Sequence, residues 1–206
     1  MIRHPGVTGA ILAGGLASRL GGAEKPLLEL TGPEDTPLSR LLAVFSGRFP
    51  RTLIVTTRPG LYAGFAAQPV ADAVAGRGPL GGLEAALSAA ATPFVFLCGG
   101  DMPFVSGPLI DAMAGRAAPG RILALERHGR PEPLHALYPI EALAAVRSAL
   151  DGGLRMMLDL YSLVPADLLP ASAYQGLPGA GRSFENINTP EDLDRARRLA
   201  GAPAPP

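Results

Sequence analysis

The chain has 206 residues, 48% of them hydrophobic and 17% charged, which is enough for one sizeable core and too little for two ordinary domains. Its 18 basic and 18 acidic residues cancel, which excludes a broad basic surface for nucleic acid or an anionic membrane, so any phosphate must be bound locally. The single cysteine, Cys98, excludes an internal disulfide and a cysteine-built metal site and favours a reducing, cytoplasmic location, and no apolar run reaches the roughly 18 residues of a membrane span.

Three short apolar segments bounded by turn residues are typical of buried strands: residues 7–12, 52–57 and 94–98. Apolar residues at helical spacing recur between and after them, in residues 36–48, 80–91, 106–117 and 139–150. Strands that alternate with helices predict an α/β fold, with a mostly parallel, Rossmann-like sheet and helices on both of its faces.

The second half of the chain is less regular. Residues 121–126 and 133–138 flank a polar turn and predict an antiparallel edge to the sheet, whereas residues 170–182 resemble a loop. A last amphipathic helix is predicted from about Thr189 to Ala200, with Pro190 in its first turn. We therefore expect a single domain over residues 1–200 and a disordered tail at 201–206.

A glycine-rich stretch, residues 13–22, follows the first predicted strand. Ligands bind beyond the carboxyl ends of the strands in open α/β sheets, and glycines let backbone N–H groups approach a phosphate closely. Arg19 and Lys25 would neutralise the charge of that phosphate. The spacing matches neither a P-loop nor a dinucleotide fingerprint. The alternative is a flexible glycine loop with two solvated cations.

Two residue types are scarce enough to draw attention. Lys25 is the only lysine, and Asn186 and Asn188 are the only asparagines. If the composition disfavours these types in general, they mark positions where arginine or serine cannot substitute. The alternatives are a lone surface lysine and a turn that leads to a helix cap at Thr189.

Two aspartates follow apolar segments. Asp101 comes after the predicted strand at residues 94–98, and Asp72 comes after the short apolar segment 69–71. Mg²⁺ prefers one or two carboxylates together with phosphate oxygens, so Asp101 is a candidate magnesium ligand at the edge of the sheet. The alternative for Asp101 is a turn-capping aspartate before the helix at 106–117.

Five segments stand out in chain order: Leu12-Ala-Gly-Gly-x-x-Ser-Arg-Leu-Gly-Gly-x-x-Lys25, Gly78-Pro-Leu-Gly-Gly-Leu83, Gly100-Asp-Met-Pro-Phe104, Pro133-Leu-His-Ala-Leu-Tyr138 and Asn186-Ile-Asn-Thr-Pro-Glu-Asp192. Taken together, they resemble the molybdenum cofactor guanylyltransferases, a branch of the nucleotidyltransferase superfamily. The opening loop alone indicates a nucleotidyltransferase, whereas the second and fifth segments resemble the guanylyl branch more closely.

The resemblance implies transfer of GMP from GTP to the terminal phosphate of molybdopterin, with Mg²⁺ required and pyrophosphate released. It implies catalytic roles for Lys25, Arg19 and Asp101, with Asp101 as the metal ligand. The nucleotide-binding residues that it implies are Leu12, Ala13, Gly14, Gly15, Lys25, Thr56, Asp72, Gly78, Pro79, Leu80 and Asp101. The second substrate would lie near His135, Tyr138, Asn186 and Asn188. Transient contact with cofactor-delivery proteins or molybdoenzymes is also expected.

The chain departs from the family pattern at three positions. Ser18 stands where a second arginine is common, Glu24 where an aspartate is usual, and Thr56 where an asparagine is often found. Because a hydroxyl has one donor and a carboxamide has two donors and an acceptor, Thr56 is expected to weaken one nucleotide contact. Base selectivity is therefore less firmly predicted than the type of reaction.

Three other functions remain open at this point. The chain could use CTP or another phosphate acceptor, or it could bind the pterin without catalysing transfer. A sugar-nucleotide glycosyltransferase would require an Asp-x-Asp metal motif, and the third position here is Pro103. His135 lacks metal-ligand spacing and, on its own residue pattern, is expected at the surface or in the core.

Overall fold

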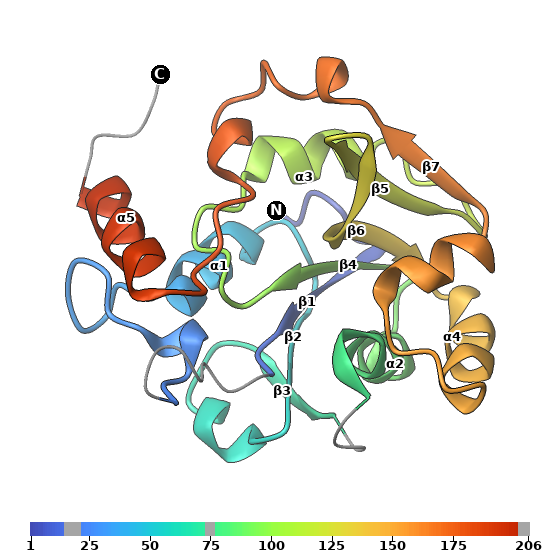
Figure 1. Ribbon diagram of the computed structural model, residues 1–206, viewed down its shortest axis with the longest axis horizontal. Coiled ribbons are helices and arrows are strands. Elements are labelled where there is room, and N and C mark those ends of the chain that lie inside the picture. Colours follow the sequence, from blue (N-terminus) through green and yellow to red (C-terminus); the bar gives the residue numbers. More distant parts are fainter. Residues whose placement is uncertain (15–21, 73–76, 202–206) are drawn as a thin grey trace.

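The computed structural model describes residues 1–14, 22–72 and 77–201. Its seven strands form one sheet in the order β3-β2-β1-β4-β6-β5-β7 (Figure 1). The bounds are Val7–Leu12 for β1, Thr52–Thr56 for β2, Gln68–Ala71 for β3, Phe94–Gly99 for β4, Ile122–Arg127 for β5, Arg130–Pro139 for β6 and Ala166–Leu169 for β7.

Strand β6 is antiparallel to both of its neighbours, and the other neighbouring strands pair in parallel. The predicted α/β fold with a mixed, mostly parallel sheet is therefore confirmed. The antiparallel strand is not the outermost one, however, because β7 extends the sheet beyond β5.

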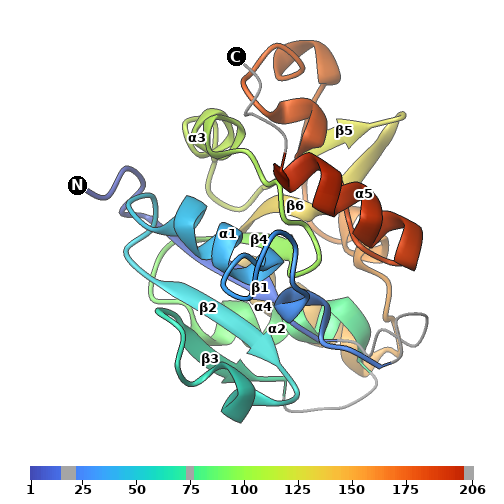
Figure 2. The same cartoon turned by 90° about the vertical axis from the view of Figure 1, so that its left-hand side faces the viewer.

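Helices cover both faces of the sheet (Figure 2). Their bounds are Pro37–Phe45 for α1, Gly78–Ala89 for α2, Gly107–Ala114 for α3, Ala142–Asp151 for α4 and Pro190–Gly201 for α5. Gly201, which the sequence assigns to the tail, thus closes α5, and residues 202–206 lie outside the described part of the chain.

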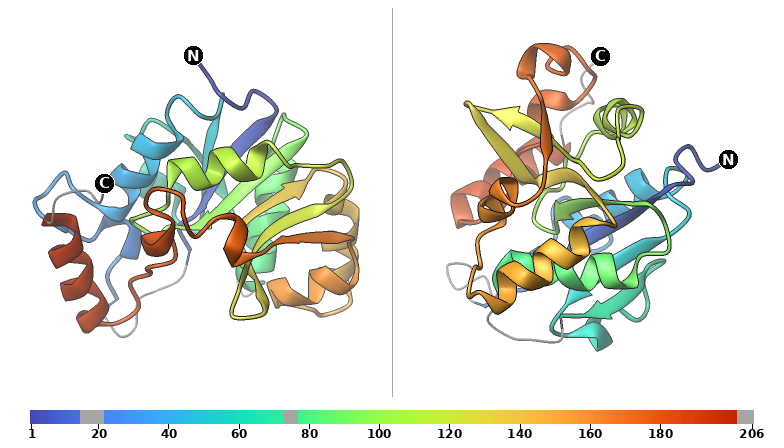
Figure 3. Two further views of the ribbon diagram at one scale, coloured as in Figure 1. Left: turned by 90° about the horizontal axis from the view of Figure 1, so that it is seen from above. Right: turned by 90° about the vertical axis from the view of Figure 1, so that its right-hand side faces the viewer.

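Alternating strand residues build two cores. Ile11 and Phe96 face α1 and α3, whereas Ala10 and Leu97 face α2 and α4. The alternation follows from the two-residue period of a strand that is buried on both faces. A third, small core joins α5 to residues 28–30 (Figure 3).

Caps on two helices fix where the helices begin. The Thr36 hydroxyl accepts a hydrogen bond from the amide of Ser39, and the Ser39 hydroxyl accepts one from the amide of Thr36, at the start of α1. The Ser106 hydroxyl caps α3 in the same way. No helix in the described residues is long and apolar enough to cross a membrane.

Candidate active site

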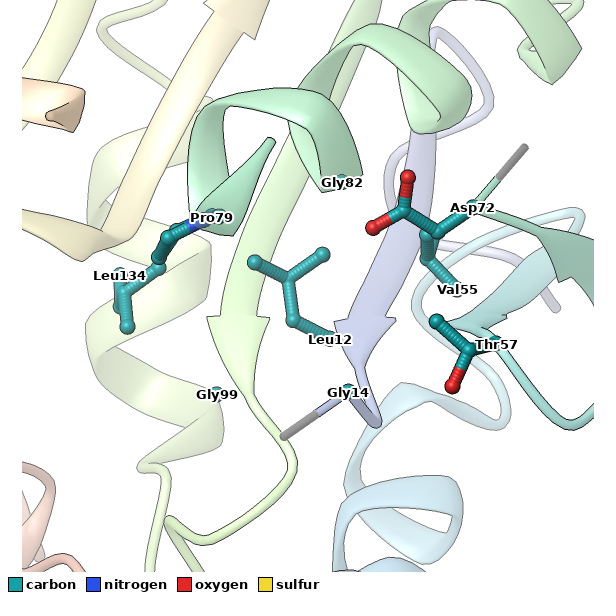
Figure 4. Close-up of a pocket in the computed structure, with 10 residues that line it drawn as sticks. Leu12, Gly14, Val55, Thr57, Asp72, Pro79, Gly82, Gly99 and Leu134 are labelled. Carbon is teal, nitrogen blue, oxygen red and sulfur yellow. The ribbon is translucent and has the colours of Figure 1, made fainter. Parts of the chain in front are cut away.

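A pocket of about 420 Å³ lies where β1, β2 and β4 end at one edge of the sheet. Figure 4 shows Asp72 and Thr57 on one side of this pocket and Pro79 and Leu134 on the other. The lining residues are Leu12, Gly14, Val55, Thr57, Asp72, Gly78, Pro79, Gly82, Gly99 and Leu134. An apolar cleft with a few polar groups is typical of a small-molecule site.

The first turn of α2 lies directly against the end of β1. A Cβ atom at Gly82 would come within 2.8 Å of Cδ2 of Leu12, which is closer than packed carbon atoms approach. Gly82 therefore allows Leu12 to pack against the helix and form the middle of the pocket wall (Figure 4).

Three residues that are far apart in the chain meet beside this pocket. The Lys25 ammonium donates to Oδ2 of Asp101 at 3.0 Å and to Oδ1 of Asn188 at 2.5 Å. The side chains of Lys25 and Asp101 are 20% and 21% exposed, so a ligand can still reach both. The contact brings together residues from the first loop, the end of β4 and the start of α5.

Lys25 reaches Asp101 because Pro26, the next residue in the chain, packs closely on the end of β4. A Cβ atom at Gly100 would lie 2.8 Å from Cγ of Pro26 and 2.9 Å from the Leu12 carbonyl oxygen. With glycine there, the Gly100 amide donates to that carbonyl at 2.9 Å, and Pro26 packs beside it. Lys25 opens the short 3-10 helix η2 (Lys25–Leu27), directly before Pro26.

Asn188 is held in place by the backbone around it. The amide of Ile187 donates to the Asp101 carbonyl oxygen at 3.0 Å. The amides of Asn188 and Thr189 both donate to Oδ2 of Asp192 at 3.0 Å. Although burial raises the pKa of Asp192, these amide hydrogen bonds hold it below its usual value. The cap at the start of α5 therefore also fixes the Asn188 side chain beside Lys25.

Five residues predicted from the sequence to bind nucleotide line the pocket, namely Leu12, Gly14, Asp72, Gly78 and Pro79. The predicted residues Gly15 and Arg19, together with Ser18, lie outside the described residues. The other five lining residues were not predicted as nucleotide contacts, namely Val55, Thr57, Gly82, Gly99 and Leu134. The position of Thr57, just past the end of β2, is the one signal that could have identified it.

Three other expected nucleotide contacts need correction. The Thr56 side chain is buried, and its hydroxyl accepts a hydrogen bond from the amide of Arg58 at 3.1 Å. The Ala13 amide is already bonded to the Val55 carbonyl oxygen, and Leu80 is part of the core beneath α2. None of these three residues lines the pocket, whereas Thr57 does.

His135 and Tyr138, which were expected near a second substrate, both have side chains that are fully buried in the core. His135 packs between the rings of Phe96 and Phe184, and burial lowers its pKa to about 3, which keeps it neutral. The Tyr138 hydroxyl donates to the Pro133 carbonyl oxygen. Asn186, by contrast, is exposed.

The donor set suits one type of magnesium binding. Among the described residues, no group of three or more His, Cys, Asp and Glu side chains could enclose a metal ion. Asp101 does offer an accessible carboxylate, and Mg²⁺ is often bound by one or two carboxylates plus the phosphate oxygens of a substrate. The site therefore fits Mg²⁺ that is bound together with a polyphosphate.

The chain is similar to known proteins over most of its length. The family model for the MobA-like NTP transferase domain matches residues 9–166. The probable molybdenum cofactor guanylyltransferase of Pelotomaculum thermopropionicum is 34% identical over 94% of this chain and 93% of its own length. The molybdenum cofactor guanylyltransferase of Mesorhizobium japonicum is 33% identical over 94% of this chain and 95% of its own length.

A solved structure is similar over nearly the same extent. The molybdopterin-guanine dinucleotide biosynthesis protein A of Archaeoglobus fulgidus superimposes with a TM-score of 0.80 and 26% identity, covering 94% of this chain and 98% of the other.

Proposed function

The chain belongs to the MobA-like NTP transferase family, and from that membership we propose that it transfers GMP from GTP to the terminal phosphate of molybdopterin, releasing pyrophosphate. The observation that carries this proposal is the contact between the only lysine and Asp101 beside a nucleotide-sized pocket. These two residues and the pocket lie at the carboxyl ends of parallel strands, where α/β enzymes bind their substrates.

The reaction forms one bond and breaks another at the same phosphorus. An oxygen of the acceptor phosphate attacks the α-phosphorus of GTP, and the bond from that phosphorus to the bridging oxygen breaks, so pyrophosphate leaves with the electron pair. No general base is required, because the attacking phosphate is already an anion. Catalysis then depends on aligning two anions and neutralising the charge between them.

The Lys25 ammonium is suited to that neutralisation. An ammonium has three donors, and in the described residues Asp101 and Asn188 take two of them. The third donor can point to a phosphate oxygen while the two protein contacts hold the charge in place. A positioned charge of this kind stabilises the transition state without reorganising during the reaction.

We further propose that Mg²⁺ is required and that Asp101 is its protein ligand. When bound, the ion would neutralise phosphate charge. Asp101 is held for this role by its neighbours: its carbonyl oxygen is bonded to Ile187, and one carboxylate oxygen to Lys25. The other carboxylate oxygen packs against Gly99, where a Cβ atom would lie 2.6 Å from it.

The test is pyrophosphate release by the purified protein with molybdopterin, comparing GTP with CTP and Mg²⁺ with EDTA. We expect release that requires GTP, molybdopterin and Mg²⁺ together. Faster turnover of CTP would overturn the guanylyl assignment, and undiminished turnover in EDTA would overturn the metal requirement. No turnover of either nucleotide would indicate a pterin-binding relative without activity.

The product must pass to an enzyme that uses it. We propose that this occurs by transient contact with cofactor-delivery proteins or molybdoenzymes, in the cytoplasm. The single cysteine, Cys98, is free and buried, and a chain without a disulfide fits a reducing compartment. Co-purification of the active protein with a molybdoenzyme, abolished at high salt, is the observation that supports such a contact.

A further inference from the structure

Glu24, the residue before Lys25, is bound by two side chains. Glu24 forms an ion pair with Arg58, and its Oε2 accepts a hydrogen bond from the Tyr62 hydroxyl at 2.9 Å. The Glu24 side chain is only 15% exposed, although it lies in a surface loop. Both partners belong to the segment that follows β2, which contains the 3-10 helix η3 (Pro59–Tyr62).

That segment is itself rigidly attached to the sheet. Tyr62 has no exposed surface, and its ring is part of the core between the sheet and α1. The amide of Arg58 donates to the Thr56 hydroxyl at the end of β2. Burial raises the pKa of Tyr62, so its hydroxyl stays protonated and can donate to Glu24.

Glu24 and Lys25 therefore connect two strand ends. Glu24 is bound to the segment after β2, and Lys25 is bound to Asp101 after β4. Glu24 is the N-terminal flanking residue of η2, and Lys25 is the first residue of that helix, so the two side chains leave adjacent backbone positions. Fixing Glu24 consequently limits how far the Lys25 backbone can move from Asp101.

We propose that Tyr62 and Arg58 act, through Glu24, as positioning residues for the Lys25 ammonium. The catalytic consequence of this inference rests on the proposed function, whereas the structural part does not. Lysine has a long, flexible side chain, so an unanchored backbone would spread its charge over many positions. The two anchors keep that charge where a phosphate must bind.

The chain differs here from the usual family pattern, in which an aspartate precedes the lysine. In this chain the Glu24 carboxylate contacts both Tyr62 and Arg58. Glu24 thus has a structural role in this chain, because it joins the start of η2 to the segment that follows β2.

The experiment uses the fact that Lys25 is the only lysine. Lysine labelled with ¹⁵N at Nζ and ¹³C at Cε gives the full-length protein one side-chain signal, which reports the surroundings of this ammonium directly. The variants are Tyr62→Phe, which removes only the hydroxyl, and Arg58→Ala, at a side chain that is 47% exposed. The matched control is Tyr174→Phe, which removes a hydroxyl that donates to the Glu126 carbonyl oxygen in the same core.

We expect the Lys25 signal to move toward that of free lysine in Tyr62→Phe and in Arg58→Ala, and to stay in place in Tyr174→Phe. An unchanged signal in both test variants would overturn the proposal. So would an equal shift in Tyr174→Phe, because the effect would then be general loosening of the core. The Lys25 signal does not depend on enzymatic activity, so failure of the proposed function is recognised separately.

In the transfer assay, the expected effect of Tyr62→Phe is a fall in kcat of roughly 10- to 10²-fold, as for other residues that orient a catalytic group. The KM for GTP should change less, because the pocket walls are intact. A loss confined to KM would contradict a positioning role and would indicate that Tyr62 acts on nucleotide binding.

Discussion

The Lys25 ammonium is the charge on which the proposed chemistry depends. It lies 3.0 Å from the Asp101 carboxylate, and Lys25 is the only lysine in the chain. Arginine would retain the charge, but its planar fork is wider and would not sit between Asp101 and Asn188 in the same way.

The first prediction concerns Lys25→Met, which keeps an unbranched side chain of similar length and removes the charge. We expect kcat to fall by on the order of 10²-fold or more, because one preorganised charge is lost from the transition state. Pyrophosphate release measures the effect, and an unchanged melting temperature shows that the fold is intact. Turnover close to that of the wild-type protein would remove Lys25 from the mechanism.

The second prediction separates the two asparagines. Asn188→Ala removes a hydrogen bond to the Lys25 ammonium, and a bond to a charged group contributes about 1.5 kcal/mol or more, so we expect kcat to fall roughly tenfold. Asn186 is exposed, and Asn186→Ala should instead raise the KM for molybdopterin. Steady-state kinetics with both substrates varied distinguishes these effects. Equal effects of both substitutions on kcat would contradict the separation.

The sequence allowed the residue types of the site to be predicted, but not all of their partners. The positions of Lys25 and Asp101 after strands of one parallel sheet were enough to predict that they would share an edge. The hydrogen bond from Lys25 to Asn188 and the contact of Glu24 with Tyr62 depend on how loops fold back in space, which no local spacing encodes. The burial of the His135 side chain could not be predicted for the same reason, because Leu134 beside it lines the pocket.

Among the elements, the close packing of η2 against the end of β4 decides whether the site forms. Gly100 makes that packing possible, since a Cβ atom there would collide with both Pro26 and the Leu12 carbonyl oxygen. One of those contacts is to backbone, which cannot move aside as a flexible side chain can.

The third prediction follows from this contact. Gly100→Ala should destabilise the protein by about 1–3 kcal/mol, as overpacking does, and lower kcat, because η2 must shift away from Asp101. Gly64→Ala is the matched control, since a Cβ atom there meets nothing within 4 Å, and it should change stability by no more than about 0.5 kcal/mol. Urea denaturation measures both variants. Equal stability of the two would show that the contact at Gly100 is not tight.

The segment before α1 is stabilised by a pair with a defined pH dependence. The hydrogen bond from Arg40 is the main cause that lowers the pKa of Asp35 to about 2, against a usual value of 3.8. Because this pKa is lowered in the folded protein, the carboxylate contributes stability above about pH 4. That contribution is lost as the pH falls through the folded pKa of about 2.

The fourth prediction is that Asp35→Asn lowers the urea midpoint at pH 5 to 7, and that the difference from the wild-type protein shrinks between about pH 4 and pH 2. Unfolding curves at several pH values measure it. A difference that is constant across this range would show that the Asp35 charge contributes nothing to stability.

Element prediction succeeded where apolar runs are bounded by turns. The sequence predicts strands at 7–12, 52–57 and 94–98, and β1, β2 and β4 match these to within one residue. It misses β7, because the four residues Ala166–Leu169 show no alternating pattern and become a strand only by pairing with β5. The helix starts at Pro37 and Pro190 were predictable from a proline that follows a threonine.

At the scale of the whole molecule, the sheet places its parallel half and its antiparallel half on either side of the candidate site. The pocket draws Leu12, Val55 and Gly99 from the ends of β1, β2 and β4, and Leu134 from the antiparallel strand β6. The start of α5 then returns to the same edge with Asn188. Groups from almost the full length of the chain therefore converge on this edge of the sheet.

The most direct measurement is a crystal structure of the protein with GTP and Mg²⁺. We predict the nucleoside between Asp72 and Pro79, the triphosphate within hydrogen-bonding distance of the Lys25 ammonium, and the ion on the Asp101 carboxylate. A triphosphate bound away from these two side chains, or a metal ion that makes no contact with Asp101, would contradict the account.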